Sequence, residues 1–289
     1  MVQNIKWYLL MNKLLVFQTD FGLDDGAISA MEGVAFSVDF DLNIRHLTHN
    51  IPQYNIFDAS YRLHQAINYW PAGTVFVSVV DPGVGSERKS IVAKTVTGQY
   101  IVTPDNGTIT HIERFIGIEE IRLIEEGTNR LKNSELSYTF YGRDVYAYTG
   151  ARLASGTISF EDIGPVMNKD EVVLLELYGC HDIENGVMGQ IDILDVRFGS
   201  LWTSIPYEKF RQCGFNLGDD ILVEIFHNGT KVYSNMINYG KSFADVAINE
   251  PLIYMNSAYH MAVAINQGSF SKAYGIGTGK DWKITMTMK

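Results

Sequence analysis

The sequence is poor in cysteine and in clustered positive charge, and each shortage excludes a class of protein. Its 289 residues include two cysteines, Cys180 and Cys213, which are too few for a disulfide framework and lack the spacing of metal ligands. We expect two small buried thiols in a reducing cytoplasm. Lys and Arg number 23 against 33 Asp and Glu, and they form no block. Because phosphate binding needs a concentrated basic face, we expect no nucleic-acid partner.

Long apolar runs, targeting signals and common cofactor motifs are also missing. No apolar stretch approaches the roughly 20 residues of a membrane span, so no membrane partner is expected. Residues 1–10 lack the cleavage site of a secretion signal, and Met11 is an alternative start because the first clear strand follows it. The absence of a GxGxxG motif argues against an NAD fold. His46 and His49 are close but have no evident third ligand, so no metal site is expected.

The pattern of apolar residues changes half-way along the chain. In the first half, buried strands such as residues 14–18 and 74–80 alternate with helical periodicity at 25–38 and 55–67. Such alternation implies an α/β domain with a mostly parallel sheet and helices on both faces, which we assign to residues 12–180. Residues 186–289 show short alternating runs and an Asn228-Gly229 hairpin signal. They predict an antiparallel barrel or sandwich.

The most informative stretch is DPGVGSER, residues 81–88. It follows the apolar run at 74–80, so Asp81 leaves the end of a buried strand directly into a Pro/Gly turn, and Arg88 comes seven residues later. In open α/β sheets, ligands bind at the carboxyl ends of the strands. An Asp and an Arg held together there can orient one small polar molecule, such as a water.

A second acidic turn, TDFGLDD, follows the first strand and opens the first helix. Helix capping explains Asp24 or Asp25, but Asp20 precedes the turn. A strand-end Asp suits a bidentate hydrogen bond to the two hydroxyls of a ribose. Alternatively, the three acids could hold calcium, as a comparable Asp-rich turn does in the nucleoside hydrolases. The residues alone leave both alternatives open.

Aromatic residues mark two later turns. Tyr141 lies beside a glycine in TFYGRD, where a phenol can pack on a ligand and donate one hydrogen bond. In DVRFGSLW, Asp195 precedes Phe198 and Trp202. These two aromatic residues are either part of the core or a stacking wall for a purine, with Asp195 near an ammonium group.

Taken in order, these turns resemble those of the adenosyl-forming S-adenosylmethionine (SAM) hydrolases, also called SAM hydroxide adenosyltransferases. Fluorinase and chlorinase belong to the same superfamily. The resemblance covers residues 14–266 through TDFG with paired acids, DPGVG with a following Arg, PDNG, TF-x-GRD, D-x-x-FG-x-x-W, and FAD followed by NS. It implies a C-terminal β-barrel and a homotrimer, with SAM between one subunit's N-terminal domain and its neighbour's C-terminal domain. No cofactor is implied, because SAM is the substrate.

The resemblance also implies a role for each matching residue. In the N-terminal domain, Asp20 would hold the ribose hydroxyls with Asp24 nearby, and Tyr54 would place an aromatic ring against the ligand. In the C-terminal domain, Asp195 would receive the methionine ammonium group and Ser257 the carboxylate. The adenine pocket would be lined by Phe198, Trp202 and Phe243, with Ser200 at a contact where Asn is usual.

The residues around the attacking group combine two patterns. Asp81 and Arg88 match the first two members of an Asp-Arg-His set that is thought to position water in the hydrolases. Tyr141 occupies the position of the His, where the halogenases also have Tyr. Ala258 replaces an Arg of the halogenases. An anionic Asp81 would repel a halide by about 4 kcal/mol at about 4 Å and an effective dielectric of about 20. This repulsion favours water over a halide as the attacking group.

We therefore expect in-line attack of an oriented water at C5′ of SAM, giving adenosine and L-methionine. The sulfonium makes methionine a good neutral leaving group, so only the water needs activation, for which Asp81, Arg88 and Tyr141 are the catalytic candidates. A halide-dependent SAM adenosyltransferase, a calcium-dependent nucleoside hydrolase and a non-catalytic SAM or adenosine binder remain the alternatives.

Overall fold

The computed structural model describes residues 13–288, which form two compact units. The first unit ends at Leu175 and the second begins at Glu176. Residues 176–180, which the sequence analysis placed in the first domain, therefore group with the second unit. Position 11, the alternative start, lies outside the described residues.

The first unit is built on a seven-stranded sheet with the order β2-β1-β3-β5-β4-β6-β7. The strands on one side of the sheet run parallel to each other, namely β2 (Asn43–Thr48), β1 (Leu14–Thr19), β3 (Val75–Val79) and β5 (Tyr100–Pro104). The other three pair antiparallel: β4 (Ser90–Thr95), β6 (Ile118–Leu123) and β7 (Val166–Met167). This parallel-rich sheet confirms the predicted α/β class.

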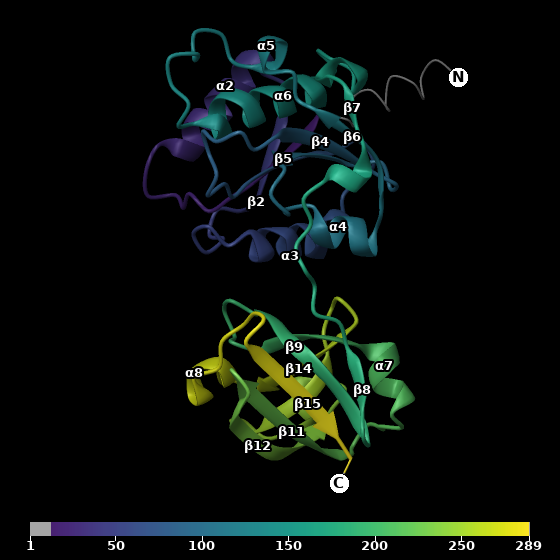
Figure 1. Ribbon diagram of the computed structural model, residues 1–289. Coiled ribbons are helices and arrows are strands. Elements are labelled where there is room, and N and C mark those ends of the chain that lie inside the picture. Colours follow the sequence, from purple (N-terminus) through teal and green to yellow (C-terminus); the bar gives the residue numbers. More distant parts are fainter. Residues whose placement is uncertain (1–12, 289) are drawn as a thin grey trace, which may run out of the picture. The chain divides into compact units, whose positions relative to one another are not determined.

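Helices cover both faces of this sheet (Figure 1). On one face, α2 (Ala27–Val38), the π-helical turn η1 (Gly142–Ala147) and α6 (Tyr148–Ser155) pack on Leu15 and Phe17. On the other face, α3 (Ile56–Ile67) and α4 (Thr110–Phe115) pack on Val16. Because successive strand residues point to opposite faces, the apolar run in β1 supplies both cores. The remaining short helices are α5 (Glu126–Asn129), η2 (Glu161–Ile163) and η3 (Lys169–Glu171).

The second unit contains a closed barrel of seven strands. Around the ring these are β9 (Gly186–Leu194), β10 (Leu201–Pro206), β14 (His260–Ile265), β13 (Pro251–Met255), β12 (Thr230–Tyr239), β11 (Asp220–His227) and β15 (Trp282–Thr287), which returns to β9. A short β8 (His181–Ile183) adds to β9. All neighbours are antiparallel except β12 and β13. Closure of β10 on β9 decides between the predicted alternatives in favour of the barrel.

Local signals in the sequence act as expected. The Asn55 side chain accepts a hydrogen bond from the Asp58 N–H at 3.0 Å and caps α3, as predicted. Asn228 and Gly229 join β11 to β12 with φ values of 50° and 78°, the left-handed pair that a tight hairpin needs.

Three short helices complete this unit: α7 (Tyr207–Gln212), η4 (Phe243–Asp245) and α8 (Phe270–Tyr274). Within residues 13–288, no helix has the length and apolar character for crossing a membrane.

The close packing of α6 on β3 predicts the effect of a single methyl group. A Cβ atom at Gly150 would lie 2.4 Å from Cγ2 of Val77, well inside van der Waals contact. Overpacking costs about 1–3 kcal/mol and outweighs the better helix propensity of Ala, so Gly150→Ala should lower the melting temperature of this unit. In α2, Gly33→Ala is the matched control, since nothing lies within 4 Å of its Cβ position and the melting temperature should hold or rise. Equal behaviour of the two variants would contradict this packing.

Candidate active site

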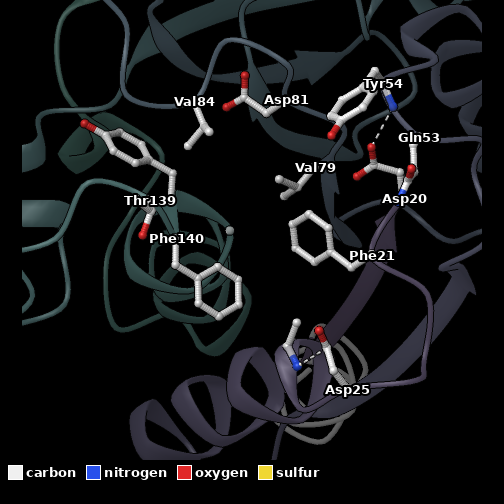
Figure 2. A pocket seen from close by; sticks show the side chains of 13 residues that line it. Asp20, Phe21, Asp25, Gln53, Tyr54, Val79, Asp81, Val84, Thr139 and Phe140 are labelled. Carbon is white, nitrogen blue, oxygen red and sulfur yellow. Dashed lines mark hydrogen bonds between the residues drawn. The ribbon is translucent and has the colours of Figure 1, made fainter.

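A cavity of about 520 Å³ opens at the carboxyl edge of strands β1 and β3. Its volume is within the range of about 300–1,000 Å³ that is typical of small-molecule sites. Val79 is the last residue of β3, and most of the other side chains in Figure 2 come from four loops around this space. They follow β1, β2 and β3 and precede η1, and the lining residues are Asp20, Phe21, Asp25, Ala27, Gln53, Tyr54, Val79, Asp81, Val84, Thr139, Phe140, Tyr141 and Gly142.

Asp20 and Tyr54 are joined through the backbone on one wall of the cavity. The Tyr54 N–H donates to Oδ2 of Asp20 at 2.9 Å, as Figure 2 shows. Tyr54 adopts a φ of 66°, which is uncommon for a residue with a side chain and is typical of positions that the surroundings hold in place. Tyr54 as a residue is 68% exposed. This turn therefore presents a carboxylate with one oxygen anchored, next to an open aromatic ring.

Asp81 faces the same cavity and forms an ion pair with Arg88. The two side chains are only 5% and 9% exposed, and Nη2 of Arg88 lies 2.5 Å from Oδ2 of Asp81. The other oxygen, Oδ1, accepts a hydrogen bond from the Gly83 N–H at 3.2 Å. Burial raises the pKa of Asp81 above its ordinary value, and the charge of Arg88 opposes that rise. The result is a charged carboxylate that is more basic than an exposed one.

Arg88 is anchored to the core rather than to the cavity. It is not among the lining residues, so it reaches the cavity through Asp81. Its Nη1 donates to the Tyr146 hydroxyl at 2.5 Å and to the Ser90 hydroxyl at 3.2 Å. Tyr146 is completely buried, and this burial raises its pKa, so the phenol stays neutral. The guanidinium is thereby fixed in one orientation behind Asp81.

Tyr141 lies at the start of η1 with its ring close to two cations. The Arg88 and Arg130 guanidinium carbons lie 5.6 Å and 5.0 Å from the ring centroid, a distance at which a cation attracts an aromatic face. Arg130 is held by Glu126 at 3.0 Å and by the carbonyl of Ser137. A π-helical turn such as η1 is frequent at functional sites. The structure therefore brings Tyr141 together with Asp81, Asp20 and Tyr54 around the cavity, with Arg88 behind Asp81.

The other two acids of the first turn have different places. Asp24 is exposed and does not line the cavity. Asp25 does line it, and its Oδ1 accepts the N–H of Ala27, the first residue of α2, at 2.8 Å, although Gly26 holds the N-cap position of this helix. Across residues 13–288, no three His, Cys, Asp or Glu side chains are grouped so that they could hold a metal ion. The calcium site considered for Asp20, Asp24 and Asp25 is therefore not formed in this part of the chain.

The remaining candidates belong to the second unit, where three of them gather around Tyr254. Burial raises the pKa of Tyr254. Hydrogen bonds with the Ser200 and Trp202 side chains oppose this rise, and the charge of Asp195 adds to it. Asp195 also closes its own turn, since its Oδ1 accepts the N–H groups of Arg197 and Phe198 at 3.1 Å and 3.3 Å. Ser200 and Trp202 are buried, so Trp202 has little open ring surface.

The other aromatic candidates in this unit are accessible. Phe198 is 66% exposed and Phe243 is 39% exposed, and the Phe243 ring centroid lies 5.0 Å from that of Tyr254. Ser257 lies in an exposed turn between β13 and β14. Phe198 and Phe243 are therefore the members of this set that offer a surface for stacking.

Comparison with known proteins gives this arrangement a family. Residues 15–164 match the model of the SAM hydroxide adenosyltransferase N-terminal domain, and residues 189–283 match that of the C-terminal domain. The chain belongs to the SAM hydroxide adenosyltransferase family. This membership confirms the resemblance inferred from the sequence.

Individual relatives of this family span most of the chain. A protein of Methanocaldococcus jannaschii named (R)-S-adenosyl-L-methionine hydrolase is 36% identical over 219 residues, which is 74% of each chain. One of the same name from Salinispora tropica is 30% identical over 93% of this chain and 96% of its own length. A fluorinase of Actinoplanes is 24% identical over 95% and 98%. A crystal structure of an uncharacterised conserved protein from Thermotoga maritima is similar with a TM-score of 0.86, at 31% identity over 95% and 100% of the chains.

Sequence reasoning missed several residues in and behind the cavity. Phe21 and Phe140 line the cavity with ring centroids 6.0 Å apart, and a Cβ at Gly142 would lie 3.1 Å from Phe21. All three belong to the motifs TDFG and TF-x-GRD, so their position beside Asp20 and Tyr141 in the sequence could have indicated that they line the cavity. Tyr146 had no such signal, because its contact with Arg88 spans 58 positions of the sequence.

The environment of Asp81 predicts how its side chain titrates. Its carboxyl ¹³C resonance should shift with a midpoint above the ordinary 3.8, because burial disfavours the charged form. Arg88→Ala should move the midpoint further up, since the positive charge that opposes the rise is removed. The resonance is assigned with Asp81→Asn. A midpoint at or below 3.8 in the unmodified protein would mean that the charge of Arg88 outweighs burial, and would contradict the predicted direction of the shift.

Proposed function

We propose that this protein hydrolyses S-adenosyl-L-methionine to adenosine and L-methionine. The observation that carries the proposal is the Asp81–Arg88 ion pair, which is nearly buried and presents one carboxylate to a cavity large enough for a small molecule. Membership of the SAM hydroxide adenosyltransferase family supports the substrate class. The names of the relatives point to the (R) epimer of the sulfonium as a form to be tested.

The proposed chemistry gives Asp81 the central role. A water held by its carboxylate attacks C5′ in line with the bond to sulfur, and that bond breaks as methionine leaves with its electron pair. Asp81 orients the water and accepts its proton, for which a raised pKa makes it a better base near neutral pH. Arg88 keeps the carboxylate charged before the reaction. No cofactor is needed, because the sulfonium already makes methionine a good leaving group.

Binding of the rest of the substrate follows the predicted roles. Asp20, with Oδ2 anchored by the Tyr54 N–H, would accept hydrogen bonds from the ribose hydroxyls, and Tyr54 would pack on the ligand. Phe198 and Phe243 would stack on adenine, with Asp195 and Ser257 at the methionine end. These groups belong to two units, and the proposal includes a homotrimer in which neighbouring subunits complete each site. The cytoplasmic location stays a prediction.

A halide-dependent reaction is the second candidate because Tyr141 lines the cavity and fluorinases are among the relatives. The charge at Asp81 argues against it. A halide placed beside this carboxylate would be repelled, whereas a water can donate a hydrogen bond to it. The two reactions differ in their product and are therefore separable.

Product analysis tests the proposed function directly. Incubation with each sulfonium epimer of SAM in chloride buffer should give adenosine and methionine, resolved by liquid chromatography. A matched incubation in nitrate buffer should give the same rate, because chloride takes no part. Exclusive formation of 5′-chloro-5′-deoxyadenosine would support the halide reaction instead, and indifference to a chelator would separate both from a calcium-dependent nucleoside hydrolase.

Two variants test the assignment of the ion pair. Asp81→Asn should lower kcat by about 10²–10⁴-fold, because the base is lost while the shape is kept. Arg88→Ala should also lose most turnover, and both variants should still bind SAM in calorimetry. Removing one partner of a buried pair also destabilises the fold, so melting temperatures are measured alongside. Asp182→Asn, which removes an exposed carboxylate paired with Lys209 at 3.0 Å, is the control. Unchanged kcat in Asp81→Asn would refute the assigned role.

A further inference from the structure

Four side chains form a continuous line from the surface of α2 to the turn that carries Asp20. Oε1 of Glu32 lies 2.9 Å from Nε2 of His46, and Nδ1 of His46 lies 2.8 Å from Nε2 of His49. Nδ1 of His49 lies 2.9 Å from the Thr19 hydroxyl. Thr19 is the last residue of β1 and directly precedes Asp20. The line therefore ends behind one wall of the cavity.

Thr19 and His49 shape this wall through further hydrogen bonds. The Thr19 hydroxyl accepts the Phe21 N–H at 3.2 Å, and the carbonyl of His49 accepts the Gly22 N–H at 2.8 Å. Asp20 and Phe21, which both line the cavity, thus lie in a turn that the end of the line holds in place. A change of the hydrogen bond between Thr19 and His49 would therefore alter the position of the Asp20 carboxylate.

With both histidines neutral, every hydrogen bond of the line is satisfied in one direction. The Thr19 hydroxyl donates to Nδ1 of His49, while its oxygen accepts from Phe21. Nε2–H of His49 then donates to Nδ1 of His46, and Nε2–H of His46 donates to Glu32. Each neutral imidazole needs one donor and one acceptor nitrogen, and this arrangement supplies both.

One added proton reverses the line. If His46 carries protons on both nitrogens, its Nδ1–H donates to Nε2 of His49, and Nδ1–H of His49 donates to Thr19. The Thr19 oxygen then accepts two hydrogen bonds, and its own hydrogen loses the acceptor it had. Proton uptake at the surface end of the line therefore reverses the hydrogen bond at the turn beneath Asp20 and leaves the Thr19 hydroxyl hydrogen without its acceptor.

The two histidines lie in different surroundings. His49 is 5% exposed, and burial together with the charge of His46 lowers the pKa of His49 to about 4. His46 is partly exposed and faces the Glu32 carboxylate from α2. From β1, the pair contacts the Thr19 hydroxyl and the Phe17 ring, and the neighbouring Arg45 donates to the carbonyl of Ile44. Within residues 13–288, Glu32 is therefore the charged side chain that contacts the histidine pair.

We propose that Glu32, His46, His49 and Thr19 form a positioning relay, in which one proton on the histidine pair reverses the hydrogen bond at Thr19 and weakens substrate binding by Asp20. The inference rests on the proposed function for the role of Asp20. His46 and His49 are positioning residues, since neither lines the cavity. The relay acts on KM, whereas the Asp81–Arg88 pair governs kcat.

The test measures KM and kcat for SAM between pH 5 and pH 8 in the unmodified protein and two variants. KM of the unmodified protein should rise several-fold on acidification. In Glu32→Gln, which keeps a hydrogen-bond acceptor but removes the charge, this rise should move down by about half a pH unit, with kcat at pH 8 unchanged. In His46→Asn, whose amide oxygen can still accept from His49, KM should stay at its high-pH value throughout.

Glu119→Gln is the matched control, because it removes an exposed carboxylate that is likewise ion-paired, to Lys94 at 2.9 Å. Its KM profile should follow that of the unmodified protein. Identical KM profiles in the unmodified protein, Glu32→Gln and His46→Asn would overturn the relay. A purely structural role for Glu32 or His46 would change stability or KM at all pH values alike and would also overturn it.

A second readout separates this inference from the proposed function. Long-range ¹H–¹⁵N spectra at pH 8, assigned with His46→Asn, should show His49 with its proton on Nε2. A proton on Nδ1 of His49 would overturn the relay even if the protein hydrolyses SAM. Absence of any adenosine, with the Nε2–H form of His49 present, would instead refute the proposed function and leave the hydrogen-bond line standing.

Discussion

The parallel pairing of β1 with β3 is the constraint on which the site depends. Thr19 stands opposite Val79 in this register, so the chain leaves both strands at the same edge of the sheet. Asp20 and Asp81 therefore come to one cavity from positions 61 residues apart in the sequence. Two carboxylates at one edge repel each other, and the charge of Asp20 contributes to the raised pKa of Asp81, after burial. The site is stable only because each carboxylate has its own partners.

The partners of Asp81 reach into the hydrophobic core. Arg88 donates to the carboxylate and also to the hydroxyl groups of Tyr146 and Ser90. These two hydroxyl oxygens lie 3.0 Å from each other. A buried guanidinium without such acceptors would cost several kcal/mol, so the network lets a charge lie in the interior. It also sets the geometry of Asp81 from behind, because the core around Tyr146 is closely packed.

Asp20 is held in a different way, mainly by backbone groups and neutral side chains. The Tyr54 N–H fixes one oxygen, and the turn after Asp20 is tied to Thr19 and His49. Neutral hydrogen bonds leave the charge of Asp20 available to a ligand, whereas the charge of Asp81 is balanced internally. These surroundings fit the different tasks that we propose for the two carboxylates, binding for Asp20 and proton transfer for Asp81.

Much of this arrangement was already determined by the order of residues along the chain. The apolar runs of β1 and β3, the capping Asn55 and the Asn228-Gly229 turn act locally, so their patterns predicted the α/β unit and the strands of the second. Motifs at strand ends predicted the places of Asp20 and Asp81 for the same reason, and the motif before η1 did so for Tyr141, since a strand end and a helix start are local features. Contacts between distant segments needed the tertiary structure: closure of β10 on β9, Tyr146 behind Arg88, and Glu32 joined through two histidines to Thr19. Such contacts depend on which faces pack together, and no short pattern in the sequence encodes that choice.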